Sequence, residues 1–146
     1  MNEITKKRLV EAGWSEDRRI DTTIFKNKYD EIGLDYPESI DNFLKKYGML
    51  KINPKDKKYF DVSFDAIAAI GCNLDGDYFR ECLDEYDIED RVYPVGEACR
   101  SELFVLMTSN GKFYCYTDGL LVLLGNSVDE MLDCVVGECR KAVRID

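Results

Sequence analysis

The stretch YPVGEACRSELFVLMTSNGKFYCY, residues 93–116, decides the fold that this sequence predicts. It contains two apolar runs joined by Ser109-Asn110-Gly111, and Asn-Gly pairs favour tight hairpins because both residues tolerate positive φ. Asp118-Gly119 repeats this turn chemistry one strand later. We therefore expect an antiparallel meander, with strands at residues 91–96, 103–108, 112–117 and 120–124.

Helical patterns flank the meander. Apolar residues recur with helical period at 3–12, 22–32 and 37–47, and a glycine follows each run. A closing helix starts after Ser127, which can form a capping box with Glu130. The residues expected to face the core are Ile4, Leu9 and Ala12; Phe25, Tyr29 and Ile32; Ile40, Phe43, Leu44 and Tyr47; and Met131, Leu132, Val135 and Val136.

The middle of the chain links the first helices to the meander. Short strands are expected at 49–52 and 59–64, a helical turn at 65–70, and a helix at 77–86. A chain of 146 residues buries roughly 68–70% of its unfolded surface, which is enough for one domain. We therefore predict an α+β fold and a single domain over residues 1–146, with N-terminal helices, an antiparallel β-meander sheet and a C-terminal helix packed on it.

The six cysteines are expected to be reduced. The sequence shows no signal peptide at its start and no apolar run near the ~20 residues of a membrane span, so we expect a cytoplasmic protein that does not enter a membrane. No pair has CxxC spacing and the chain has no histidine, which argues against a zinc site. Cys99, Cys115 and Cys134 lie in or beside apolar stretches and are expected to act as small core residues.

Residues that would support catalysis are scarce. Without histidine the chain lacks the commonest general base, and no glycine-rich phosphate loop is present. The run from Asn73 to Asp77 resembles a calcium loop in composition only, because Tyr78 stands at the sixth place, which requires glycine. A hydrolase that uses a pair of carboxylates stays a formal alternative. We expect no enzyme, no cofactor and no bound metal.

The most distinctive feature is the run DGDYFRECLDEYDIED, residues 75–90, called the acidic segment below. It holds eight carboxylates against the single cation Arg80. The segment is either a solvated helix face or a landing surface for a basic protein. Tyr78 is either an aromatic contact residue or part of the core. The candidate partner-binding residues are Asp75, Asp77, Tyr78, Glu81, Asp84, Glu85, Asp87, Glu89 and Asp90.

Charge is unevenly distributed along the chain. Residues 1–58 carry 13 Lys and Arg against 11 Asp and Glu, a net of +2, whereas residues 59–146 carry 7 against 18, a net of −11. Phosphate contacts require an excess of cations, so nucleic acid is not expected as a partner. A basic protein would complement this charge.

The order of motifs resembles the SUKH superfamily of bacterial immunity proteins, in particular its third subgroup. The stretches that carry the resemblance are LVEAGWSEDRRID (9–21), SIDNFLKKYGMLKI (39–52), VYPVG (92–96), ELFVLMTSNGKFYCY (102–116) and LLGNSVDEMLDCVVGE (123–138). Members often have a second glycine after Gly48, where this chain has Met49. The shared residues Trp14, Gly48, Tyr93, Pro94, Gly96, Gly111 and Gly125 are expected to maintain the fold.

The resemblance implies a non-enzymatic function. Such proteins bind and neutralise the C-terminal catalytic domain of a secreted polymorphic toxin, often a nuclease or a nucleic-acid deaminase. A basic cleft in such a toxin domain would suit the acidic segment. The alternative is a small-molecule-binding or regulatory scaffold of the same fold, with a pocket lined by Tyr93, Tyr114 and Tyr116.

Overall fold

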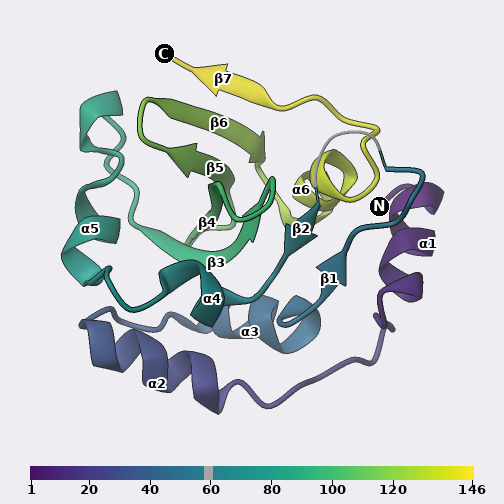
Figure 1. Ribbon diagram of the computed structural model, residues 1–146, viewed down its shortest axis with the longest axis horizontal. Helices are drawn as coiled ribbons and strands as arrows, with labels where there is room; N and C mark the ends of the chain where they lie inside the picture. Colours follow the sequence, from purple (N-terminus) through teal and green to yellow (C-terminus); the bar gives the residue numbers. More distant parts are fainter. Residues whose placement is uncertain (58–60) are drawn as a thin grey trace.

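The computed structural model describes residues 1–57 and 61–146. Its strands form one antiparallel sheet in which they follow one another in sequence order (Figure 1). The expected meander is confirmed as β3 (Val92–Ala98), β4 (Leu103–Thr108), β5 (Phe113–Thr117) and β6 (Leu120–Gly125). β1 (Lys51–Ile52) and β2 (Val62–Ser63) extend it at one edge; the start of the strand predicted at 59–64 lies outside the described residues. β7 (Val143–Ile145), which the sequence did not predict, extends the other edge.

The turns of the meander place positive φ on glycine. In the loop after β4, Thr108 N donates to Lys112 O at 2.8 Å, and Gly111 has a φ of 93°. Asp118 and Gly119 join Thr117 directly to Leu120, with Gly119 at a φ of 81°. These glycines allow both hairpins to close within two or three residues, as the sequence predicted.

Six α-helices surround the sheet in the described part of the chain. They are α1 (Glu3–Glu11), α2 (Thr23–Ile32), α3 (Glu38–Tyr47), α4 (Ala66–Ile70), α5 (Gly76–Glu81) and α6 (Val128–Val135). The apolar stripes predicted for α3 and α6 are buried, whereas Ile4 of α1 is only half-buried. Pro37 precedes α3 as its N-cap rather than lying in its first turn.

The capping box of α6 is shifted from the predicted one. Ser127 Oγ accepts a hydrogen bond from Glu130 N at 3.2 Å, as expected. The Glu130 carboxylate, however, accepts from Asn126 N at 3.2 Å, one residue earlier than the capping-box pattern requires. This carboxylate also pairs with Arg140 at 2.8 Å, so it serves two donors on the same side of the helix start.

The strand register divides the side chains between two faces of the sheet, because residues directly opposite in an antiparallel pair point the same way. Tyr93 pairs with Met107, which pairs with Phe113, and these residues form the face called the α3 face. On it, Phe113 lies 5.2 Å from Phe43 of α3 between ring centroids, and Tyr93 stacks on Tyr29 of α2 at 6.2 Å. The α3 face therefore forms the core with the N-terminal helices.

The opposite face, called the α5 face, contains Phe104 and Leu106 of β4 with their partners Tyr116 and Tyr114. Phe79 of α5 packs edge-to-face on Phe104, with 5.7 Å between the ring centroids. The two faces are thus covered by different parts of the chain. Figure 1 shows α5 on the side of the sheet away from α1 and α6.

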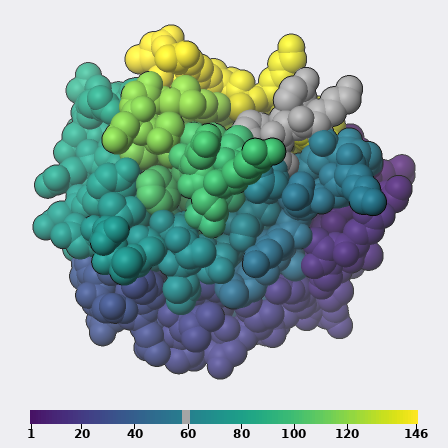
Figure 2. Space-filling view, in the orientation of Figure 1, coloured from purple at the N-terminus to yellow at the C-terminus, as the bar shows by residue number. Residues whose placement is uncertain are grey.

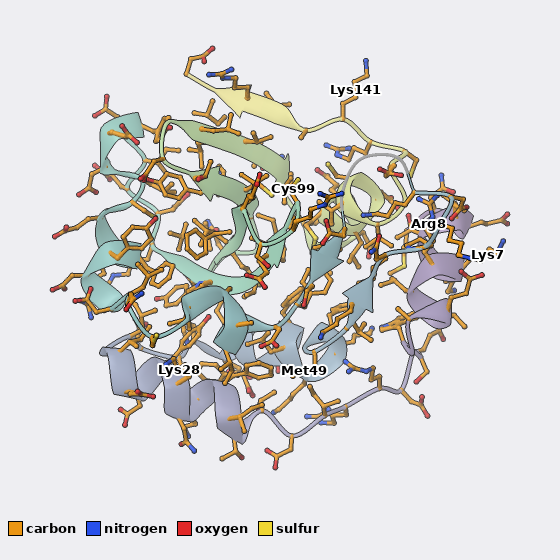
Figure 3. The ribbon with its side chains drawn as sticks, in the orientation of Figure 1. Lys7, Arg8, Lys28, Met49, Cys99 and Lys141 are labelled. Atoms are coloured by element: carbon orange, nitrogen blue, oxygen red, sulfur yellow. The ribbon has the colours of Figure 1, made fainter. Side chains whose placement is uncertain are left out.

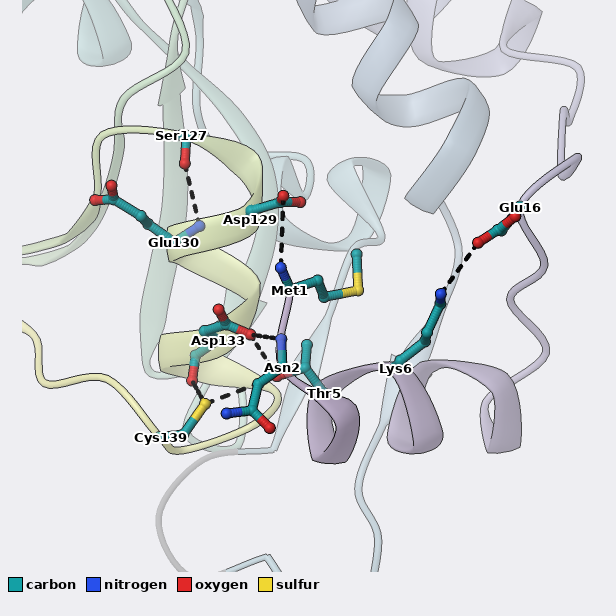
Figure 4. A network of polar contacts seen from close by, with 10 residues as sticks. All are labelled: Met1, Asn2, Thr5, Lys6, Glu16, Ser127, Asp129, Glu130, Asp133 and Cys139. Carbon is teal, nitrogen blue, oxygen red and sulfur yellow. Dashed lines mark hydrogen bonds and ion pairs between the residues drawn. The ribbon is translucent and has the colours of Figure 1, made fainter.

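Helix α1 docks on α6 through a network of polar contacts (Figure 4). Asp133 Oδ1 accepts from Asn2 N at 2.8 Å and from Thr5 Oγ1 at 2.7 Å. Burial alone would raise the pKa of Asp133, but the hydrogen bonds from Asn2 and Thr5 outweigh it and lower the pKa. Arg8, which Figure 3 labels, donates to Val136 O at 2.8 Å. The N-terminal helix is therefore tied to the end of the closing helix.

The turn after α3 places a bulky residue where glycine is favoured. Met49 has a φ of 67° and its side chain remains 42% exposed (Figure 3). Its backbone N donates to Phe64 O at 2.8 Å, which fixes the turn against the strand that follows. The tight turn expected from a second glycine is thus retained, at the conformational cost of a Cβ in the left-handed region.

All six cysteines are free. Cys115 and Cys134 are buried as predicted, but Cys99 is only half-buried. It opens a turn in which Cys99, Arg100 and Ser101 have φ values of 54°, 56° and 68°, so it lies beyond the end of β3 rather than under it. Among the described residues, no helix is both long enough and apolar enough to cross a membrane.

Candidate functional site

The acidic segment does not form the single helix predicted at 77–86. It consists of α5, a break at Cys82 and Leu83, and the short 3₁₀ helix η1 (Asp84–Tyr86), which closes at Asp87 with a φ of 55°. Carboxylates three and four residues apart repel one another along a helix, and Glu81, Asp84 and Glu85 would have this spacing if the helix continued. Cys82 and Leu83, the two residues of the break, are both buried.

The apolar side of the acidic segment rests on the α5 face. Phe79 and Leu83 are 1% and 3% exposed, and the half-buried Tyr78 lies 5.9 Å from Phe104 between ring centroids. Tyr78 therefore belongs partly to the core and partly to the surface. Tyr116 is buried, which raises the pKa of its hydroxyl, and nearby Tyr78 and Cys82 of the segment raise this pKa further.

The start of the acidic segment is anchored to the end of α2. Arg80 donates to Gly33 O and forms an ion pair with Asp77. Asp75 is the N-cap of α5 and accepts a hydrogen bond from Tyr78 N at 3.1 Å. A Cβ on Gly76 would lie 2.8 Å from Ile32 O, so the two backbones are in close contact here. Asp75 and Asp77 are thus engaged in holding the segment in place.

Most of the remaining carboxylates have no ion pair in the part of the chain that the structure describes. Asp90 lies 4.0 Å from Lys112 Nζ. Five others are exposed and form no ion pair with any residue in the described ranges 1–57 and 61–146: Glu81, Asp84, Glu85, Asp87 and Glu89. In the space-filling view the segment forms part of the teal flank of the molecule (Figure 2). The acidic segment therefore exposes five carboxylates that have no ion pair with any described residue, while its buried side is packed on the sheet and its start is held by the end of α2.

Two further carboxylates lie close to the acidic segment although the sequence places them elsewhere. Asp118, in the turn between β5 and β6, acts on the hydroxyls of Tyr78 and Tyr116, and raises their pKa values after the larger effect of burial. Asp146 acts in the same direction on Tyr86. Asp118 has the sequence signature of a turn residue alone, so only the fold reveals its position beside the segment.

The pocket predicted between Tyr93, Tyr114 and Tyr116 is wrong. Tyr93 lies on the α3 face, where its hydroxyl donates to Asp35 Oδ2 at 2.8 Å. Tyr114 and Tyr116 lie on the α5 face because they pair with Leu106 and Phe104. The sheet itself separates the first tyrosine from the other two, so the three cannot line one pocket.

Close backbone packing occurs at three of the glycines that carry the family resemblance, Gly48, Gly96 and Gly125. A Cβ on Gly48 would lie 2.4 Å from Leu44 O, and one on Gly96 would lie 2.3 Å from Ser63 O, so any side chain would push the backbone apart. Tyr29 Oη donates to Pro94 O at 2.7 Å, and Trp14 stacks on Tyr47 with 6.1 Å between centroids. Gly111 lies in the β4–β5 hairpin and Gly125 beside Met131.

The described residues contain no group of three or more His, Cys, Asp or Glu that could hold a metal ion. Burial raises the pKa of the Cys82 thiol and of the Cys115 thiol to about 12 each, which leaves them protonated and poorly nucleophilic near neutral pH. The arrangement at this surface is suited to binding through charge rather than to a reaction.

The model of the family described as SUKH-3 immunity protein matches residues 1–138, and the chain therefore belongs to that family. No curated protein and no solved structure matches the chain. Family membership implies neutralisation of a polymorphic toxin by a non-enzymatic inhibitor.

Proposed function

We propose that this SUKH-3 immunity protein inserts its acidic segment into the basic cleft of a toxin domain that acts on nucleic acid, either a nuclease or a nucleic-acid deaminase. Such a domain must hold a polyanion, so its cleft is rich in Lys and Arg. The carboxylates would occupy the places of phosphates and exclude the substrate. Inhibition is then stoichiometric, with one immunity protein blocking one cleft.

The observation that carries this proposal is the set of five exposed carboxylates, from Glu81 to Glu89, that form no ion pair with any residue the structure describes. Internal ion pairs would have to break before a partner could use the charges, whereas these five carboxylates have no ion pair within residues 1–57 and 61–146. Phe79 and Leu83 fix the segment to the sheet, so little conformational entropy is lost on binding. Complementary charge also accelerates encounter, which an inhibitor of a lethal enzyme needs.

The other candidate residues have supporting roles in this proposal. Asp75 and Asp77 hold the segment in place through the N-cap and the pair with Arg80, and Asp90 lies beside Lys112. Tyr78, which is half-buried beside Phe104, would add an aromatic contact to the partner. Six free thiols suit the reducing cytoplasm, where we propose that the protein acts.

The experiment is a binding titration against the toxin domain encoded beside this gene, repeated from 50 to 500 mM salt. We expect affinity to fall steeply with salt, because screening weakens exposed charge pairs. The double variant Asp84→Lys, Glu85→Lys should bind at least about tenfold more weakly at low salt. Its matched control, Glu11→Lys with Asp30→Lys, makes the same change in net charge on α1 and α2 and should bind like the natural protein.

Three results would count against the proposal. Equal weakening in both double variants would mean that net charge alone matters. Tight binding that is indifferent to salt would place the contact on an apolar surface. Inhibition of a toxin domain that acts on neither DNA nor RNA would leave the immunity role but remove the phosphate mimicry.

A further inference from the structure

A small hollow lies between the loop that follows α1 and the polar side of α3. Its volume is about 330 Å³, and its walls carry four cations, two carboxylates and one amide, from residues 16–19 and from Asn42, Lys45 and Lys46. Figure 1 shows α1 and the start of this loop on the side of the molecule away from α5. The hollow shares no lining residue with the acidic segment, so it is a separate feature of the surface.

The hollow has an excess of positive charge. Four lining cations against two lining carboxylates leave a net charge of +2. One of the carboxylates, Glu16, is already paired with Lys6 at 3.1 Å, and one of the cations, Lys45, is paired with Asp41 at 2.8 Å. The other three lining cations form no ion pair with any residue that the structure describes: Arg18, Arg19 and Lys46. Their charge is therefore available to an anion.

Arg18 is held in place by the end of α3. Its two terminal nitrogens donate to Lys46 O and Gly48 O, each at 2.8 Å, and Ile20 N donates to Lys45 O at 2.9 Å. These bonds join the loop to carbonyls at the end of a helix, which need partners from outside it. A guanidinium has five N–H donors, so three of those of Arg18 remain for a ligand. Burial lowers the pKa of Arg18, but a guanidinium still stays charged at neutral pH.

Lys46 is positioned by two aromatic rings. Its Nζ lies 5.7 Å from the ring centroid of Trp14 and 5.9 Å from that of Tyr47. The two rings stack on each other, and both are buried. The attraction between an ammonium group and a ring face favours this position of the side chain. Lys46 therefore loses less conformational freedom on binding a ligand than an unrestrained lysine would.

We propose that this hollow binds a small ligand through a phosphoryl group. A phosphate monoester carries a charge of about −2 at neutral pH, which matches the excess charge of the hollow. Its oxygens accept hydrogen bonds from guanidinium and ammonium groups, which are the donors that Arg18, Arg19 and Lys46 provide. The volume is at the lower end of the range for ligand sites, so the rest of the ligand is small. This site does not depend on the proposed function.

Nucleic acid is the less favourable source of the phosphoryl group. A strand carries one charge at every nucleotide, so a protein that binds it needs cations along an extended path. Here the excess of cations is confined to one hollow, while the whole chain has a formal charge of −9. A compact phosphorylated molecule meets the positive charge without approaching the negative remainder of the surface.

The first test is a titration of the ¹⁵N-labelled full chain with inorganic phosphate and with pyrophosphate, followed by amide chemical shifts at constant ionic strength. We expect shifts that saturate with a dissociation constant below about 1 mM and that concentrate in residues 15–20 and 42–48. Shifts that do not saturate, or that are spread over the cations of the whole surface, would overturn the inference, because they would report general screening.

The second test removes two of the three cations that have no ion pair. Arg19→Gln with Lys46→Gln should raise the dissociation constant for pyrophosphate at least about tenfold. The charge-retaining variant Arg19→Lys with Lys46→Arg should lose much less. The matched control Arg100→Gln with Lys141→Gln makes the same change in net charge at exposed positions outside the hollow, and should bind like the natural protein. Equal weakening in the control would contradict a site at this hollow.

The source of the phosphoryl group and the independence of the two proposals can both be checked. A 5′-phosphorylated oligonucleotide should bind no more tightly than pyrophosphate, and tighter binding of the oligonucleotide by tenfold or more would overturn the assignment to a small ligand. Because phosphate binding is measured without any toxin, its absence would leave the proposed function intact. Failure to bind the toxin domain would likewise leave the phosphate titration unaffected.

Discussion

The two faces of the sheet are covered in different ways. On the α3 face whole helices contribute long apolar stripes, and Phe43 alone lies within 5.3 Å of Phe64 and Phe113 between ring centroids. On the α5 face the cover is one six-residue helix, a break and a three-residue 3₁₀ helix. The first side holds the protein together. On the α5 face, the thin acidic segment exposes carboxylates that have no ion pair with a described residue. This difference distinguishes the scaffold on the α3 face from the surface that we propose for binding.

The largest effect is expected in the scaffold. Phe43→Ala should lower the free energy of unfolding by about 3–5 kcal/mol, because the ring is 3% exposed and the surrounding rings cannot close the cavity. Urea unfolding followed by circular dichroism measures this. Phe43→Leu, the control, should lose less than about half as much. A small loss in the alanine variant would mean that the α3 face is not the main core.

An intermediate effect is expected where α1 docks on α6. Asp133→Ala removes the acceptor for Asn2 and Thr5 and should cost about 1 kcal/mol at pH 7. Because the folded pKa of Asp133 is lowered, its contribution is present above the unfolded pKa near 4 and disappears as the pH falls through the folded value. Unfolding curves of both proteins from pH 7 to pH 2.5 should therefore converge at the acidic end. A constant gap across this range would rule out the carboxylate as the cause.

A smaller effect of opposite sign is expected at Met49. Met49→Gly should stabilise the protein by about 0.5 kcal/mol, because glycine adopts a φ of 67° without the penalty of a Cβ, and this gain exceeds its greater freedom in the unfolded chain. Met49→Ala keeps the Cβ and should give no gain. Thermal melting of the three proteins tests this. A glycine variant no more stable than the alanine variant would show that the turn carries no strain.

The smallest effect on stability is expected in the acidic segment. Glu81→Gln with Asp87→Asn should change the free energy of unfolding by no more than about 0.5 kcal/mol, since neither carboxylate has an ion pair in the described structure. Toxin binding at low salt should nevertheless weaken. A change that weakens binding but leaves stability intact would distinguish the acidic segment from the scaffold most clearly. A large loss of stability in this double variant would show that the segment is part of the scaffold.

Much of the fold could be predicted because its signals are local. The glycine turns, the stripe from Ile40 to Tyr47 and the start of α6 at Ser127 depend on residues within a few positions of one another. The break in the acidic segment was missed because Phe79, Cys82 and Leu83 fit a continuous helix equally well in sequence. β7 was missed since three residues carry too little pattern to predict a strand without its neighbour.

The candidate site was predicted in composition but not in arrangement. Residues 75–90 are acidic in any conformation, and their charge already excluded nucleic acid as the expected partner. Which carboxylates are free was not predictable, because it depends on Arg80 reaching Gly33, on Lys112 lying near Asp90, and on Asp118 arriving from a distant turn.

The sequence by itself determined most of the elements, their order and the sign of the net charge, because these follow from the chemistry of neighbouring residues. The tertiary structure alone decided on which face of the sheet each side chain lies. It also decided that β7 has no strand beyond it among the described residues. Tyr93 pairs with Met107, whereas Tyr114 pairs with the neighbouring Leu106, so the two tyrosines lie on opposite faces of the sheet. Pairing with β6 likewise places β7 at the edge of the sheet. Both outcomes depend on contacts between residues far apart in the chain, which local chemistry does not specify.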